Sequence, residues 1–150
     1  MSVAARDVSL ADDVKALLER YVIALDNRRF ADWLTLFGAN GYYGVIRHED
    51  FVKGNNMFTV GEGMAKLRAR CEAGDQVDRD RKLHFLSGIE VTDGDGIKAI
   101  ANFLVLRNGF PSFAGRYHLS LERAAGGLKI SRCIAVLDGD QVTETIYLPI

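Results

Sequence analysis

Hydrophobic residues in the N-terminal part of the chain recur with the period of an α-helix. Between residues 10 and 25 they fall on one helical face, at Val14, Leu17, Leu18, Tyr21 and Leu25. After a polar break at 26–29, the i, i+3, i+4, i+7 pattern returns at Phe30, Trp33, Leu34 and Phe37. This pattern predicts a first helix over about 10–25, with Ser9 near its N-cap, and a short second helix that ends before Gly38.

The middle of the chain alternates short apolar runs with polar stretches. The segment YYGVI (42–46) has the composition of a short strand, whereas 47–61 shows no period and is predicted to be a loop. A third helix is expected over 63–71, with an inward face made by Met64, Leu67 and Cys71. The polar stretch 73–82 is expected to be irregular.

The second half has the pattern of strands separated by tight turns. Strands are predicted over 83–92, 97–107, 113–123, 128–138 and 141–148. The turns between them contain Asp-Gly and Gly-Gly pairs, which supply the positive φ values that hairpin turns need. Helices followed by a run of antiparallel strands indicate an α+β fold, in which N-terminal helices pack on a curved antiparallel sheet. At 150 residues, the whole chain 1–150 is expected to form a single domain.

Composition excludes several classes of partner. A formal net charge of -1 gives no electrostatic reason to expect nucleic acid or an anionic membrane. No apolar run approaches the roughly 20 residues of a membrane span, and the N-terminus MSVAARDVSLADD lacks the apolar stretch of a secretory signal. Cys71 and Cys133 stand alone, without a CxxC motif, so we expect two free thiols and a cytoplasmic location.

The histidines and cysteines do not have the spacing of metal ligands. His48, His84 and His118 lie far apart along the chain, and no pair of cysteines is close enough to serve as ligands. A Rieske cluster needs two Cys and two His at close spacing, and a non-haem iron site needs two converging His and a carboxylate. We therefore expect this chain to hold no metal ion and no cofactor.

Several segments resemble a known superfamily in their order along the chain. They are ALDNRRFADWLTLF (24–37), LRAR (67–70), HF (84–85), NFLVLR (102–107), FAGR (113–116) and KISRCIAVLD (129–138). Together they resemble the nuclear-transport-factor-2-like (NTF2-like, cystatin-like) superfamily, and within it the small (β) subunit of aromatic-ring-hydroxylating dioxygenases. The resemblance implies a cone-shaped α+β fold. It also implies a non-catalytic, structural role in aromatic catabolism, in a trimer packed beneath an α subunit that holds a Rieske cluster and a mononuclear iron.

A second resemblance, to scytalone dehydratases, implies an enzyme. Their pattern of an Asp at a helix end, a Tyr on the next strand and a His in an H-F strand is matched by Asp26, Tyr43 and His84. It implies a protonated histidine that assists departure of hydroxide and a tyrosine-bound water that polarises a carbonyl. The alternative function is thus a stand-alone dehydratase or isomerase for a small cyclic or polyketide-like compound. That family's second tyrosine and second histidine are replaced, by Leu25 and Arg107.

The stretch ERYVIALDNRRFADWLTLF (19–37) also resembles ketosteroid isomerases, which place an oxyanion-stabilising tyrosine where Tyr21 stands. The position of their general-base carboxylate is held by Val45, which disfavours the ketosteroid reaction. Tyr21 and Asn102 are therefore candidate pocket residues. Tyr21 also lies on the apolar helix face and fits a core position, while Asn102 fits either a pocket wall or a bond to a neighbouring loop.

The candidate catalytic residues have structural alternatives as well. Asp26 can end the helix and pair with Arg28 or Arg29. His84 and Phe85 point to opposite faces of their strand, and a single strand histidine is often a hydrogen-bonded structural residue. His118 shares a face with other polar residues of its strand, which indicates a solvated or interface face.

The chain also offers more apolar surface than one small domain should leave exposed. The strand over 97–107 is close to continuously apolar, which predicts cover on both faces, and the sequence ends in IYLPI. We therefore expect a homo-oligomer, either a dimer or a trimer. Under the dioxygenase hypothesis the partner is a Rieske-type catalytic α subunit. Under the enzyme hypothesis it is a small cyclic ligand, and a third possibility is a relative that binds such a ligand without catalysis.

Overall fold

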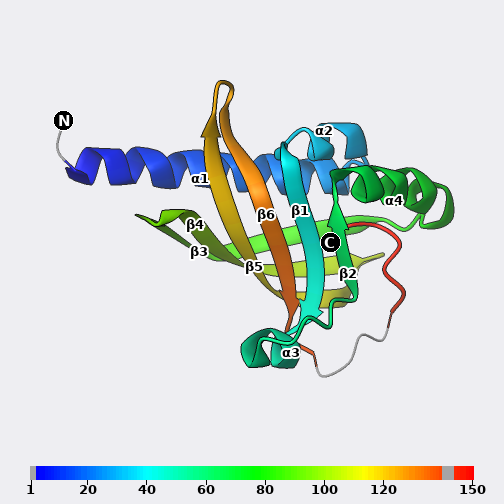
Figure 1. The fold of residues 1–150 in the computed structure, drawn as a ribbon. Coiled ribbons are helices and arrows are strands. Elements are labelled where there is room, and N and C mark those ends of the chain that lie inside the picture. The colour runs from blue at the N-terminus through cyan, green and yellow to red at the C-terminus, as the bar shows by residue number, and fades with distance from the viewer. Residues whose placement is uncertain (1–2, 140–143) are drawn as a thin grey trace.

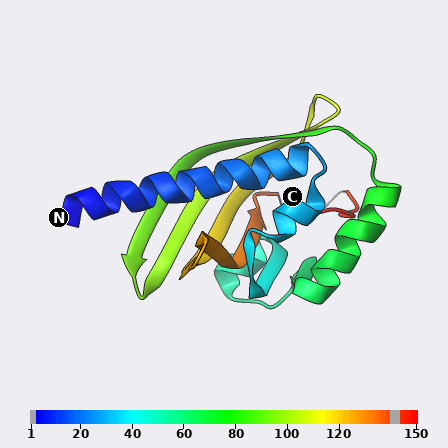
Figure 2. The same ribbon diagram turned by 90° about the horizontal axis from the view of Figure 1, so that it is seen from above.

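A long helix lies across the concave face of a curved six-stranded sheet (Figures 1 and 2). The structure is a computed structural model, and it describes residues 3–139 and 144–150. The elements are α1 (Val3–Asp26), α2 (Phe30–Leu34), β1 (Phe37–Arg47), α3 (His48–Lys53), β2 (Val60–Gly63), α4 (Met64–Val77), β3 (Lys82–Gly94), β4 (Gly96–Arg107), β5 (Phe110–Ala124) and β6 (Gly127–Leu137). The α+β prediction is therefore confirmed.

The sheet has the strand order β2-β1-β6-β5-β4-β3. From β3 to β6 each strand pairs antiparallel with the next, as the turn pattern predicted. β1 instead lies parallel to β6, which makes the sheet mixed. A parallel pair requires a long connection between its strands, and here the whole of α3 to β5 separates the two. Register shifts in β3, β4 and β5 mark bulges, which bend the sheet around α1.

The predicted apolar face of α1 forms the centre of the core. Its five members, Val14, Leu17, Leu18, Tyr21 and Leu25, are all buried. They face the inward side of the sheet, where β4 contributes the buried side chains of Ile97, Ala99, Ala101, Phe103 and Val105. Burying each such aliphatic side chain contributes roughly 1.5–3 kcal/mol. The prediction that β4 is covered on both faces is wrong, because Leu104 on the outer face is 37% exposed.

Several predicted boundaries also need correction. α1 starts at Val3, so Ser9 lies inside the helix and does not cap it. The predicted loop 47–61 contains α3 and the start of β2. α4 continues to Val77, through residues expected to be irregular. Gly38 belongs to β1 and is not a helix C-cap, because α2 ends at Leu34.

The last residues of the chain, 144–150, turn back into the interior and form no strand. The strand predicted over 141–148 is therefore wrong for residues 144–148, and 141–143 lie outside the described residues. The segment runs beside α4 (Figures 1 and 2), and its buried residues are Ile146, Leu148, Pro149 and Ile150. Ile146 and Ile150 belong to the main core cluster, so this segment contributes to the core and not to the sheet. Among the described residues no helix is long and apolar enough to cross a membrane.

Candidate active site

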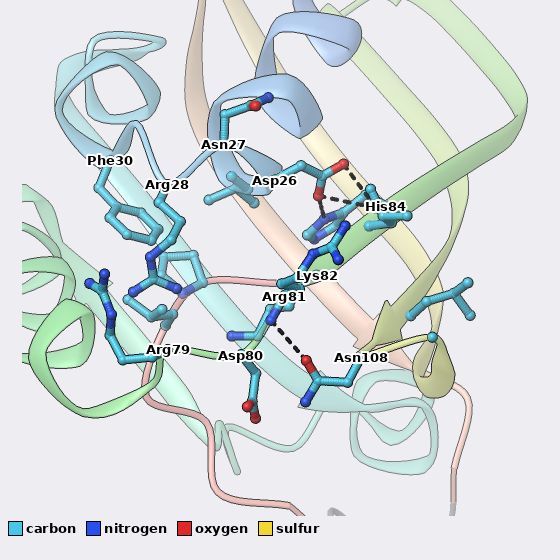
Figure 3. Close-up of a pocket in the computed structure, with 16 residues that line it drawn as sticks. Asp26, Asn27, Arg28, Phe30, Arg79, Asp80, Arg81, Lys82, His84 and Asn108 are labelled. Atoms are coloured by element: carbon cyan, nitrogen blue, oxygen red, sulfur yellow. Dashed lines mark hydrogen bonds and ion pairs between the residues drawn. The ribbon is translucent and has the colours of Figure 1, made fainter.

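The structure brings together two of the predicted site residues, Asp26 and His84. Asp26 is the last residue of α1, and His84 lies near the start of β3, the strand against which α1 packs. His84 Nδ1 lies 2.6 Å from Asp26 Oδ1, and the backbone N–H of His84 donates to both carboxylate oxygens at 3.1 Å (Figure 3). The His84 side chain is 1% exposed and that of Asp26 is 16% exposed. The two residues form a hydrogen-bonded, largely buried pair.

This contact fixes the chemistry of the imidazole. A carboxylate against Nδ1 favours the tautomer with the proton on Nδ1, because the carboxylate can only accept. The other ring nitrogen, Nε2, then carries a lone pair, and it is buried without a hydrogen-bond partner among the residues that the structure describes. The structural alternative in which Asp26 pairs with an arginine is not adopted by Arg28, whose guanidinium binds Asp75 and the carbonyl oxygen of Asp78.

A cavity of about 700 Å³ adjoins the Asp26–His84 pair. Its walls come from the end of α1, the segment before β3, the β4–β5 turn and the last residues of the chain. The lining residues include Leu25, Asn27, Arg28, Phe30, Arg79, Asp80, Arg81, Lys82, Asn108, Leu148 and Pro149 (Figure 3). A volume of this size accommodates a small organic molecule.

Basic side chains surround this cavity, but most of them are neutralised locally. Lys82 pairs with Asp78, and both Arg28 and Arg79 pair with Asp75. Within the part of the chain that the structure describes, Arg81 is the cation of this lining without an ion pair. The cavity therefore has only a modest positive bias, which is compatible with a neutral or weakly acidic ligand.

The two candidate tyrosines lie deeper in the cone and meet at one point. Tyr21 and Tyr43 are both fully buried, and each hydroxyl donates to the main-chain oxygen of Ile150 at 3.0 Å. The Tyr43 hydroxyl also accepts a hydrogen bond from the Ile150 N–H at 2.8 Å. Burial raises the pKa of each tyrosine well above its usual value near 10, so both hydroxyls are neutral donors. Among the described residues no hydrogen bond joins Tyr43 to the Asp26–His84 pair: Tyr43 is bonded to Ile150, and Tyr43 does not line the cavity beside Asp26 and His84.

Aromatic side chains pack around the two tyrosines in the core. Trp33 packs edge-on against both tyrosines, with ring centroids 5.5 Å from Tyr21 and 5.6 Å from Tyr43. Tyr117 lies 5.3 Å from Tyr21, and Cys133 Sγ lies 3.8 Å from the Tyr21 hydroxyl. The sequence reasoning missed Tyr117 and Cys133. Their inward alternation with Leu119 and Ala135 along β5 and β6 was the available signal.

Asn102 lies outside this buried aromatic cluster. Its neighbours Ala101 and Phe103 face the core, so its side chain points to the outer face of the sheet. There it accepts from Arg116 Nε at 2.9 Å and donates to Ser87 Oγ at 3.4 Å, on the two adjacent strands. His118 is also on the outer face, where its ring packs 4.6 Å from that of Phe51. Within the described ranges 3–139 and 144–150, no group of three or more His, Cys, Asp or Glu is arranged to hold a metal ion.

Comparisons with known proteins agree with this architecture. A family model described as a SnoaL-like domain matches residues 6–134. No curated protein sequence matches the chain significantly.

Many solved structures have a similar fold, and three of them are relevant to function. The first, from Novosphingobium aromaticivorans, is described as the beta subunit of an aromatic-ring-hydroxylating dioxygenase. It has a TM-score of 0.80 and 20% identity, over 90% of this chain and 93% of that one. The beta subunit of the benzoate 1,2-dioxygenase of Burkholderia mallei has a TM-score of 0.71 and 20% identity, over 91% and 95%. A Novosphingobium aromaticivorans protein described as a scytalone dehydratase has a TM-score of 0.71 and 12% identity, over 91% and 89%. Similarity at this level of identity shows the shared fold.

Proposed function

Since this chain belongs to the family of SnoaL-like domains and carries a buried Asp26–His84 pair beside a cavity, we propose that it is a cofactor-free lyase or isomerase. Its substrate is a small cyclic or polyketide-like compound. The observation that carries the proposal is the unpartnered Nε2 of His84, held in place by the Asp26 carboxylate on the opposite ring nitrogen. A buried imidazole oriented in this way is the arrangement of a general acid–base catalyst.

The proposed reaction is proton transfer at a carbon next to a carbonyl, followed by loss of water or by protonation elsewhere. In a dehydration, His84 Nε2 takes the proton from the carbon between the carbonyl and the hydroxyl-bearing carbon, and an enolate forms. The imidazolium then gives this proton to the departing hydroxyl, so that the C–O bond breaks, a C=C bond forms and water leaves. Asp26 stabilises the imidazolium charge between the two steps.

A β-hydroxyketone tests this proposal without knowledge of the natural substrate. 3-Hydroxy-1-tetralone loses water to give 1-naphthol, whose absorbance and fluorescence can be followed directly. We expect turnover above the uncatalysed rate for the wild type, and a loss of roughly 10²-fold or more in His84→Ala, the range for removal of a general acid–base group. The matched control is His48→Ala, because His48 is exposed on α3 and does not line the cavity. Equal rates for the wild type and His84→Ala would contradict the catalytic role.

A second candidate function is a structural β-type subunit of a ring-hydroxylating dioxygenase. It is supported by the apolar segment 146–150, which fills the cone, and by the fold shared with two dioxygenase beta subunits. Under this proposal the partner is a Rieske-type α subunit. Co-expression with such a subunit, followed by size-exclusion chromatography, should give co-elution in a stable complex. Turnover of the β-hydroxyketone by the isolated chain, abolished by His84→Ala, would favour the enzyme over the subunit.

A further inference from the structure

The outer face of the sheet carries a second apolar cluster, separate from the main core. Its buried members and the two aromatic rings packed against them are Ile46, Ile134, Val136, Tyr42 and Phe58. α3 and the loop 54–59 lie over this part of the outer face, near the ends of β1 and β6 (Figure 1). The sheet is therefore covered on its inner face by α1, and in part on its outer face by α3 and this loop.

Beside this cluster the outer face has a groove of about 470 Å³. Its floor includes Ile100, His118 and Ile134, which are direct cross-strand neighbours on β4, β5 and β6. Phe51 of α3 packs on this floor, with its ring centroid 4.6 Å from that of His118, and Phe58 lines the groove as well. An aliphatic floor bordered by aromatic rings suits the flat, apolar body of a small ligand.

Two cations lie next to this floor. Lys98, Ser120 and Arg132 are also cross-strand neighbours on β4, β5 and β6, and all three line the groove. Lys98 Nζ donates to Ser120 Oγ at 2.9 Å, which leaves the hydroxyl proton free to be donated to a ligand. The Arg132 guanidinium lies over the ring of Tyr42, 4.9 Å from its centroid. In the described part of the chain neither cation forms an ion pair, whereas most cations of the cavity beside His84 are paired.

The positive charge of this groove has no matching carboxylate. No Asp or Glu is among the described residues that line it. Glu90, opposite Ile100 on β3, lies outside the lining, and Asp50 of α3 is already bonded by Arg47 and Asn55. The two cations therefore attract an anion. Two copies of the chain packed groove to groove would bring like charges together, so the charge favours a different occupant.

We propose that this groove binds a small carboxylate with a flat aromatic body, such as a bicyclic aromatic acid. Its carboxylate lies between Lys98 and Arg132 and accepts from the Ser120 hydroxyl, while its rings lie against Phe51 and the aliphatic floor. β5 separates β4 from β6, and strands are about 4.8 Å apart, so two side chains from backbones roughly 10 Å apart can converge on one carboxylate. The groove and the candidate active site are on opposite faces of the sheet, so this inference goes beyond the proposed function and does not depend on it.

Calorimetric titration with two matched probes tests recognition of the carboxylate. The probes are 1-naphthoate and 1-naphthamide, which has a similar shape without the charge. We expect the wild type to bind 1-naphthoate about tenfold more tightly, since each of two exposed ion pairs contributes up to about fivefold. Removal of both cations, by Lys98→Gln combined with Arg132→Gln, should abolish this difference, whereas Lys66→Gln, exposed on α4 and outside the groove, should keep it. Equal wild-type affinities for the two probes would overturn the proposal.

NMR spectra and a variant of the groove wall locate the bound probe. Ring signals of His118 should shift on addition of 1-naphthoate, and those of His84, buried on the inner face, should not. Phe51→Ala should weaken binding of both probes about fivefold, through loss of an aromatic contact. Val52→Ala should not, because Val52 is 67% exposed on the same helix and outside the groove. Shifts at His84 alone would place the probe in the other cavity, and a second copy covering the groove would prevent binding of both probes. Either outcome would overturn the proposal. Neither readout uses turnover, so failure here leaves the proposed function standing.

Discussion

At the scale of single residues, the contact between Asp26 and His84 carries the most functional information. One carboxylate accepts from both the backbone N–H and the ring of the same histidine, so position and tautomer of the imidazole are set together. One of these two hydrogen bonds would be enough to hold the histidine in place for structural reasons alone. The double contact leaves Nε2 as the ring nitrogen without a hydrogen-bond partner in the described part of the chain, and under the proposed function this atom acts on the substrate.

Asp26→Asn should separate these two effects. The amide keeps the shape of the side chain and can still accept from the His84 backbone, but it no longer requires a proton on Nδ1. We expect turnover of 3-hydroxy-1-tetralone to fall by roughly 10²-fold or more, as for loss of an acid–base group. In ¹⁵N NMR spectra, His84 should change from the single Nδ1–H tautomer to a mixture. An unchanged tautomer in the variant would show that Asp26 does not direct the imidazole.

His118 provides a prediction about pH. Burial first, and then the nearby positive charge of Arg116, lower its pKa below the usual 6.5. The folded protein therefore binds a proton here less readily than the unfolded chain. Its stability is fully retained above pH 6.5, and falls as the pH drops from 6.5 to the lower folded pKa. Urea unfolding of His118→Gln should show less loss of stability over this window than the wild type, and NMR titration should give a His118 pKa below 6.5.

At the scale of elements, β-bulges explain how the antiparallel strands β3 to β6 curve to give the sheet its cone shape. The register of β3 against β4 shifts between Ser87 and Glu90, and Gly88 within that shift has φ of 59°. Any other residue type is disfavoured in this left-handed conformation. A Cβ at Gly88 would also lie 2.7 Å from Asn102 Nδ2, the side chain that joins β3, β4 and β5 on the outer face. Asn102 therefore supports the curvature of the sheet from its outer face.

Gly88→Ala should therefore destabilise the protein by about 1–2 kcal/mol, the usual penalty for a side chain in the left-handed region. The control is Gly94→Ala at the far end of the same strand, where a Cβ meets nothing within 4 Å. Equilibrium urea denaturation gives both free energies of unfolding. Equal stability of the two variants would indicate that the bulge adjusts without strain.

Elements with a clear period could be predicted from the sequence, and those without one could not. The face of α1 and the antiparallel order of β3 to β6 follow from spacing and turn chemistry. α3 was missed because six residues are too few to show a helical period. Residues 144–148 were wrongly predicted to be a strand because they continue the strand-and-turn pattern of the second half, and no local signal shows that this segment packs into the interior. Asp26 and His84 could be identified as candidate site residues from the sequence. The hydrogen bonds between Tyr43 and Ile150 could not, because they join residues far apart in the chain.

At the scale of the whole molecule, the outer face of the sheet carries an exposed apolar row. Leu83 is 50% exposed, Phe85 52% and Leu104 37%, and Phe85 lies directly opposite Leu104 across β3 and β4. Adjacent exposed apolar side chains on a regular strand surface are typical of a protein interface. The inward side chains of β4 are all buried in the core. Core packing therefore does not explain why its outer face also carries an apolar residue, Leu104. We predict that a second copy of the chain covers it.

We therefore predict a homo-oligomer that forms through this row. The wild type should sediment as a dimer or trimer at micromolar concentration, and Phe85→Glu should convert it to a monomer with an unchanged circular dichroism spectrum, because the added charge would be buried in the interface. Val77→Glu is the control, since Val77 is 61% exposed on α4 and away from the row. A monomeric wild type would contradict the prediction. The stoichiometry also separates the two proposed functions, since a trimer favours the dioxygenase-type subunit.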